Sequence, residues 1–161
     1  MSATIRECKA FISASFDNSA QKPIEWFIKM ANSLEIEPIW LKSMYETRPV
    51  EDKIKHHLKR CNAFIQILTE DVEELNERGW LGNEVGWADL YGIENFALFV
   101  EEGVNASGVI ATKTEPLSFD RNAIDEIAPK VNQYLLDLKS RTSKKTSISE
   151  AKECLSRLVP P

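Results

Sequence analysis

The order of apolar segments along the chain constrains its fold more than any other feature of the sequence. Short apolar runs, which we predict to be strands, alternate with longer segments whose apolar residues recur at helical spacing. The predicted strands cover residues 9–16, 37–41, 62–68, 94–100 and 115–119. Strands that alternate with helices in this way form parallel sheets. The sequence therefore predicts an α/β protein with a five-stranded parallel sheet and helices on both faces.

Helical patterns fill most of the segments between these runs. Helices are expected to begin near Pro23, Pro49 and Leu81, and a last helix to follow the apolar stripe over 124–138. The segment over 101–114 contains two glycines and shows no apolar period, so we expect a loop there.

The bulk properties of the chain limit its size class and its partners. With 161 residues, 43% of them hydrophobic and 28% charged, the chain is expected to form one globular domain. The net charge of −5 argues against nucleic-acid binding, which needs cations to neutralise phosphates. Three widely spaced cysteines fit reduced thiols and no metal site, and no apolar stretch approaches the ~20 residues of a membrane helix. The expectation is a cytoplasmic protein without a metal or a membrane partner.

The composition also suggests where the domain ends. Residues 1–138 carry the alternating pattern and are predicted to form a single domain. Basic and hydroxyl-bearing residues dominate from 139 to 148, and such a segment has few apolar side chains to bury. We therefore expect 139–161 to be a flexible linker followed by a short tail.

One glutamate occupies an unexpected position in the third helical segment. On a helical wheel with Leu81 at zero, Glu84 falls at about 300°, inside the apolar arc of the helix. That arc is formed by Trp80, Leu81, Val85, Trp87, Ala88 and Tyr91. Burial disfavours the charged form of a carboxylate, so Glu84 is a candidate functional residue. The alternative is that the glycines of this segment rotate or kink the helix, and that Glu84 simply reaches water.

Trp80 and Glu84 stand at positions i and i+4, so their side chains are neighbours on a helix. An aromatic face beside a partly desolvated carboxylate can hold a heteroaromatic substrate and stabilise positive charge. Glycosidic bond cleavage has that requirement, because its transition state resembles an oxocarbenium ion. The alternative is that Trp80 is an ordinary core residue. The sequence offers no glycine-rich phosphate loop and no support for a hydrolytic triad.

Five short motifs follow one another along the chain. They are a strand FIS, a loop that ends in Arg48-Pro49, a helix with EDKI, a strand FIQIL, and the pattern W-x-x-x-E from Trp80 to Glu84. In this order they resemble the Toll/interleukin-1 receptor (TIR) domain family. The stretches WLGNEVGWADLYG and ENFALFVEEGV resemble its microbial members most of all. The resemblance covers about residues 9–138 and implies a flavodoxin-like sheet.

Many members of that family cleave NAD at the nicotinamide–ribose bond. The resemblance therefore implies that NAD+ is a substrate, that no cofactor is needed, and that the protein acts in immune defence or cell death. It implies Glu84 as the catalytic residue and Trp80 as a border of the pocket. The loop over 43–49 would gate the site and join subunits by self-association. Further substrate contacts are expected from Ser13, Phe16, Asp17, Ser43 and Arg48.

The chain departs from the family pattern at the end of the first strand. Family members often carry an aromatic residue directly after FIS, whereas here Ala14 and Ser15 come before Phe16. We expect Phe16 to take over the aromatic role and Arg48 to contact phosphate.

Two other functions agree with the same residues. The chain can be a non-catalytic TIR interaction module, in which strand edges and the loop over 43–49 carry the function. It can also be a nucleoside deoxyribosyltransferase-like enzyme that uses Glu84. The substrate of such an enzyme lacks a pyrophosphate, so Arg48 would be dispensable.

Overall fold

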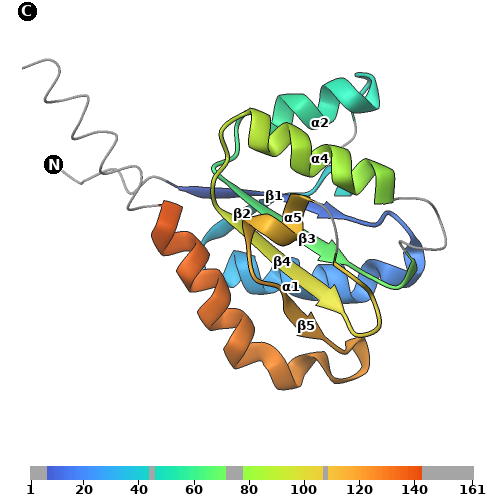
Figure 1. Cartoon of the computed structure of the whole chain (residues 1–161), viewed down its shortest axis with the longest axis vertical. Coiled ribbons are helices and arrows are strands. Elements are labelled where there is room, and N and C mark those ends of the chain that lie inside the picture. Colours follow the sequence, from blue (N-terminus) through green and yellow to red (C-terminus); the bar gives the residue numbers. More distant parts are fainter. Residues whose placement is uncertain (1–6, 44–45, 72–77, 107–108, 143–161) are drawn as a thin grey trace, which may run out of the picture.

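The computed structural model of the chain describes residues 7–43, 46–71, 78–106 and 109–142 (Figure 1). Its centre is a five-stranded sheet in the order β2-β1-β3-β4-β5, in which every neighbouring pair is parallel. The strands are β1 (Cys8–Ala14), β2 (Ile36–Ile39), β3 (Ala63–Leu68), β4 (Phe96–Glu101) and β5 (Leu117–Phe119). Flavodoxin-like proteins have this strand order. The predicted parallel α/β sheet is therefore confirmed.

The helices include one that the sequence did not indicate. They are α1 (Gln21–Ser33), α2 (Val50–Leu58), α4 (Arg78–Leu90), α5 (Val109–Lys113) and a last helix over 128–142, with 3₁₀ helices η1 (Asn18–Ala20), η2 (Leu41–Ser43) and η3 (Arg121–Ile127). Helix α5 lies in the segment over 101–114, where we expected a loop. Five residues are too few to show an apolar period, and the helix is fixed by the burial of Ile110 in the core. None of the described helices has the length and apolar character needed to cross a membrane.

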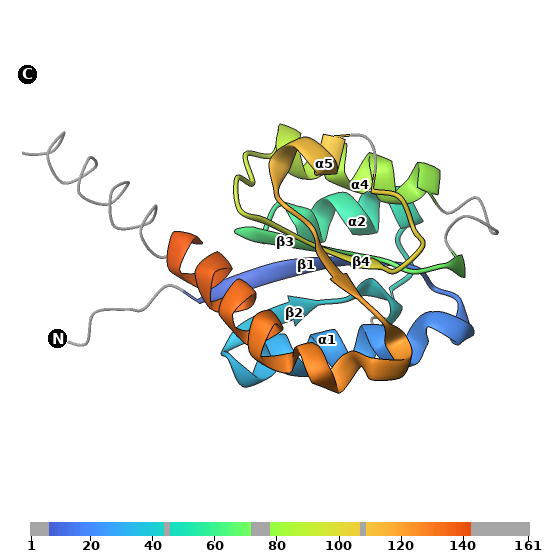
Figure 2. The ribbon, with the colours of Figure 1, turned by 60° about the horizontal axis from the view of Figure 1, so that its bottom comes forward.

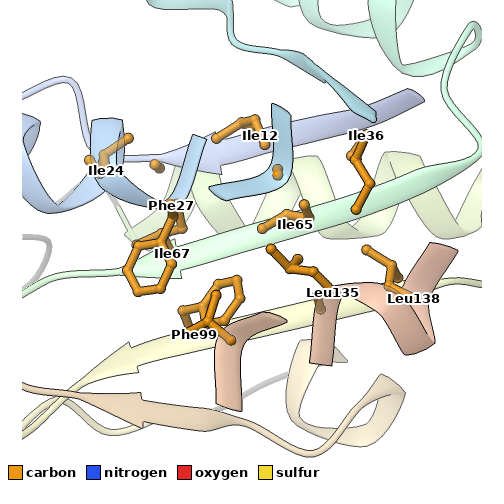
Figure 3. Close-up of a cluster of buried hydrophobic side chains, with 14 of the residues drawn as sticks. Ile12, Ile24, Phe27, Ile36, Ile65, Ile67, Phe99, Leu135 and Leu138 are labelled. Carbon is orange, nitrogen blue, oxygen red and sulfur yellow. The ribbon is translucent and has the colours of Figure 1, made fainter. Parts of the chain in front are cut away.

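Each face of the sheet has its own hydrophobic core, and the helices divide between the two faces (Figure 2). On one face, α1 and the helix over 128–142 pack on the central strands, and Phe27 stacks on Phe99 with ring centroids 4.3 Å apart (Figure 3). On the other face, α2 and α4 contribute Ile54, Leu81 and Val85 to a second buried cluster. The glutamate singled out above lies on α4, and thus on this second face.

The last helix continues through residue 142, past the domain boundary that the sequence suggested at 138. Thr142 is buried, and its hydroxyl donates a hydrogen bond to the carbonyl of Lys139 at 2.6 Å. The ammonium of Lys139 donates to the carbonyl of Leu34 at 2.8 Å. Main-chain oxygens accept hydrogen bonds from both side chains, so these polar residues can pack against the domain. Their polar character therefore did not show where the helix ends. The remainder of the expected linker and tail, 143–161, lies outside the described residues.

Candidate active site

A pocket of about 320 Å³ lies at the carboxyl end of β1. The strand order reverses beside this strand, and open parallel sheets bind ligands at such a point. The pocket is formed by the end of β1 together with α2 and α4. Its lining consists of Ala14, Phe16, Val50, Ile54, Trp80, Leu81 and Glu84. Glu84 is the only ionisable side chain among these described lining residues, and the rest of the wall is apolar or aromatic.

Glu84 lies in the pocket wall with only 6% of its surface exposed. Helix α4 runs over Arg78–Leu90 and buries Leu81, Val85 and Ala88, while Gly86 on the opposite side is exposed. The helical wheel therefore placed Glu84 correctly with the buried residues of α4, whereas Trp80 from the same arc is exposed. In surroundings of low dielectric constant, a carboxylate interacts more strongly with a positive charge than it does in water. The position of Glu84 suits the stabilisation of a cation that enters the pocket.

The mouth of the pocket is aromatic and open. Trp80 is 46% exposed and Phe16 is 50% exposed, so neither ring belongs to the core. Trp87, about two turns further along α4, is partly buried, and its ring centroid lies 6.3 Å from that of Trp80. The ammonium of Lys55 lies 5.1 Å from the centroid of Trp87. Trp80 therefore presents a free face at the pocket, and Trp87 supports it from behind.

Phe16 lies in a turn, and hydrogen bonds fix the backbone of this turn before and after Phe16. The hydroxyl of Ser15 donates to Asp71 and accepts from the amide of Asp17 at 3.1 Å. Asp17 itself caps η1 by accepting from the amide of Ser19 at 2.8 Å, and the hydrogen bonds from Ser19 lower the pKa of its carboxyl group. Lys42 donates to the carbonyl of Phe16 at 2.7 Å. These contacts fix the direction in which Phe16 leaves the strand.

The other residues expected to contact substrate are not part of the pocket lining. Ser13 is fully buried, and its hydroxyl accepts from the amide of Gln66 at 3.1 Å. Asp17 is engaged in the cap of η1, and Ser43 is the last residue of η2. Direct contacts of these residues with a substrate stay predictions.

Arg48 lies in the part of the 43–49 loop that the structure describes, and it does not line the pocket. Its Nε atom is 3.9 Å from the carboxylate of Glu46, which also accepts from His57 at 3.0 Å. The hydrogen bond from His57 lowers the pKa of the Glu46 carboxyl group. Residues 44–45 of the loop lie outside the described residues. The loop is therefore tied to α2 through Glu46, and a phosphate contact by Arg48 stays a prediction.

The sequence analysis did not predict several of the residues that form the pocket. Ala14, Val50, Ile54 and Leu81 complete the apolar wall, and only their place in a helical or strand period could have marked them as part of an apolar face. Lys42 contacts the backbone of Phe16, and its position after the second strand was the one available signal. In the described part of the chain, no group of three or more His, Cys, Asp or Glu side chains could hold a metal ion.

Comparisons with solved structures show which known proteins share this fold. No protein-family model matches the chain, and no curated protein matches it in sequence. Among solved structures, a CMP N-glycosidase from Clostridium botulinum is similar, with a TM-score of 0.55 and 19% identity over 78% of this chain and 99% of that one. A prokaryotic SEFIR domain has a TM-score of 0.53 and 19% identity, over 80% of this chain and 92% of that one. The flavodoxin-like domain of a Synechococcus protein has a TM-score of 0.51 and 7% identity, over 90% and 99% of the two chains.

At these identities the similarity shows the fold alone. The chain has a TIR-like, flavodoxin-like α/β fold with a parallel five-stranded sheet. On this fold, a largely apolar pocket with one buried carboxylate lies at the carboxyl end of β1.

Proposed function

We propose that the chain is an N-glycosidase that cleaves NAD+ at its nicotinamide–ribose bond, with Glu84 as the catalytic residue. The observation that carries this proposal is the single buried carboxylate in an apolar pocket beside the exposed faces of Trp80 and Phe16. The aromatic rings would stack on the nicotinamide ring, and Glu84 would lie near the ribose. Water would complete the reaction and give ADP-ribose, unless the ribose is captured within the same molecule to give a cyclic form.

The chemistry of the leaving group explains why one acid suffices. As the bond from C1′ to the pyridinium nitrogen breaks, its electron pair neutralises the ring, so nicotinamide leaves without a proton from the protein. The positive charge moves to the ribose as an oxocarbenium ion, which a fixed carboxylate stabilises. Water then attacks C1′ and loses a proton. Among the described lining residues, only Trp80 and Glu84 carry polar side-chain atoms, which agrees with a reaction that uses no separate acid.

A second candidate is a nucleotide N-glycosidase that releases a neutral base, because the similar structure from Clostridium botulinum is described as a CMP N-glycosidase. Cytosine is a poor leaving group as an anion, so that reaction needs a proton donor at the base. A third candidate is an interaction module without turnover, which the similarity to a SEFIR domain allows.

One panel of substrates separates these candidates. We expect the protein to release nicotinamide from NAD+, to leave CMP intact, and to transfer no deoxyribose between added bases. Chromatography of the products at equal protein concentration measures all three reactions. Release of cytosine from CMP without attack on NAD+ would favour the second candidate, and transfer of deoxyribose would favour the deoxyribosyltransferase-like enzyme. No turnover of any substrate, over a range of protein concentrations, would favour the interaction module.

We also propose that the active form is an assembly of copies of this chain, which associate through the loop over 43–49. The loop leads directly into α2, and Val50 at the start of that helix is 59% exposed at the pocket mouth. A neighbouring copy that covers Val50, Phe16 and Trp80 would remove apolar surface from water and narrow the open mouth.

Specific activity should therefore rise with protein concentration, because only the associated form is complete. The variant Tyr45→Ala, in the same loop, should need more protein to reach the same specific activity. Specific activity that does not depend on concentration, together with a monomer in sedimentation during turnover, would contradict the proposal.

A further inference from the structure

A glutamine lies buried beneath the pocket, between the sheet and α4. Gln66 is in the middle of β3, is 2% exposed, and pairs in register with Ser13 of β1. A buried amide is unfavourable unless it is hydrogen-bonded. The side-chain nitrogen of Gln66 donates to the hydroxyl of Ser13 at 3.1 Å and to the main-chain carbonyl of Leu81 at 3.1 Å. Since that carbonyl can only accept, the nitrogen must be the end of the amide that faces α4. One side chain thus connects β1, β3 and α4.

These hydrogen bonds lie directly under two walls of the pocket. Ala14 follows Ser13 on β1 and lines the pocket, and Leu81 lines it from α4. Glu84 is three residues after Leu81 on the same helix. Side chains of a helix tilt toward its N-terminus, so the carboxylate of Glu84 lies over the turn that contains Leu81. The hydrogen bond from Gln66 therefore holds the turn that sets the depth and direction of this carboxylate.

Helix α4 needs such support because its sequence forms a helix poorly. It contains Gly79, Gly82 and Gly86 within 13 residues, and glycine is among the weakest helix-forming residues. A Cβ atom added at Gly82 or Gly86 would meet no other atom within 4 Å, so close packing does not require glycine there. The position of the first turns of α4 thus depends on tertiary contacts, among which the bond from Gln66 is directional.

We propose that Gln66 is a positioning residue, which holds the first turns of α4 on the sheet and thereby places the Glu84 carboxylate at the reacting ribose. This inference rests on the proposed function of Glu84. Gln66 does not touch the substrate. Its effect is therefore on the chemical step, whereas substrate binding depends on Trp80 and Phe16.

The test is Gln66→Leu, which keeps a side chain of similar size and removes the amide. A displacement of a catalytic group by about 1 Å can cost roughly 100-fold in rate, so we expect kcat for NAD+ cleavage to fall roughly 10–100-fold. The KM for NAD+ should change little, because the aromatic walls remain. Gln66→Met, with an unbranched side chain, is the second variant and should behave alike.

Three further variants separate a positioning role of Gln66 from a loss of stability. Gly86→Ala, on the exposed side of α4, should raise the melting temperature, because alanine favours helix and has space there. In Gln66→Leu/Gly86→Ala we expect the melting temperature to return toward that of the wild type while kcat stays low.

Tyr134→Phe is the matched control, because the Tyr134 hydroxyl joins a helix to the sheet on the opposite face. This hydroxyl accepts a hydrogen bond from the amide of Leu98 at 3.0 Å and donates one to the carbonyl of Glu115 at 2.7 Å. The variant should lower the melting temperature and leave kcat unchanged.

The outcomes for Gln66 and for Glu84 can be told apart. If Glu84→Gln is inactive but Gln66→Leu keeps a kcat within twofold of the wild type, the positioning role is refuted and the proposed function stands. Recovery of kcat together with the melting temperature in the double variant would also refute it, since Gln66 would then act on stability alone. If Glu84→Gln is fully active, the proposed function fails, and the positioning role fails with it.

Discussion

Glu84→Gln is expected to remove NAD+ cleavage while the protein remains folded. Glutamine has nearly the same size and shape, but it offers no negative charge to the oxocarbenium ion. Loss of one fixed electrostatic contact to a transition state costs roughly 10²–10³ in rate, and we expect at least that here. The melting temperature should change little, because glutamine fills the same buried position, where only 6% of the Glu84 surface is exposed. Initial rates of nicotinamide release and a thermal melt measure the two effects.

A second buried carboxylate at the same edge of the sheet provides the control. Glu101 at the end of β4 is 3% exposed, pairs with Arg121 through two hydrogen bonds, and accepts from the amide of Glu70 at 2.9 Å. Glu101→Gln weakens this ion pair and should lower the melting temperature, with a smaller effect on kcat than Glu84→Gln has. If Glu84→Gln kept activity within a few-fold of the wild type, Glu84 could not be the catalytic residue.

Trp80→Ala is expected to raise KM for NAD+ and to lower kcat more than it lowers stability. Stacking of a base on an aromatic side chain contributes about 1–3 kcal/mol, so its loss should raise KM by about fivefold or more. Stability should change little, because 46% of the Trp80 surface is already exposed. Substrate saturation curves, taken with a melting curve of each variant, provide the measurement.

Trp87→Ala is the matched substitution on the same helix. Trp87 is partly buried against the core formed by α2 and α4, and Lys55 lies over its ring. Its removal should therefore lower the melting temperature more than Trp80→Ala does, and raise KM less. If Trp80→Ala unfolds the protein while Trp87→Ala does not, Trp80 acts mainly in the fold.

The sequence predicted the fold well because each strand is a separate apolar run. Strands β1, β3 and β4 are buried on both faces, so they appear as almost continuous apolar segments. Short elements were harder to predict. Helix α5 has five residues and depends on the burial of Ile110, which a local pattern does not reveal. The last helix extends to 142 because Thr142 and Lys139 bond to main-chain oxygens, although neither is apolar.

The candidate site could be predicted only where it depends on local spacing. The wheel position of Glu84, and its proximity to Trp80, follow from the 3.6-residue period of one helix. The pairing of Ser13 with Gln66 depends on the register of β1 against β3, between residues far apart in the chain. The resemblance implied that Ser13 contacts the substrate, and this stays a prediction; in the structure the Ser13 hydroxyl accepts a hydrogen bond from Gln66. Gln66 itself carried no sequence signal of a role in the site.

The most direct test of the account compares NAD+ with NADH as substrates of the wild-type protein. The two molecules have nearly the same shape, but the ring of NAD+ is a pyridinium cation and the ring of NADH is neutral. If Glu84 acts by stabilising the charge that passes from the ring to the ribose, NAD+ should give equal amounts of nicotinamide and ribosyl product, while NADH remains intact. Release of dihydronicotinamide from NADH at a similar rate would show that the pocket supplies an acid to the leaving group, which would contradict the mechanism. Failure to cleave NAD+ at any protein concentration would contradict the proposed function itself.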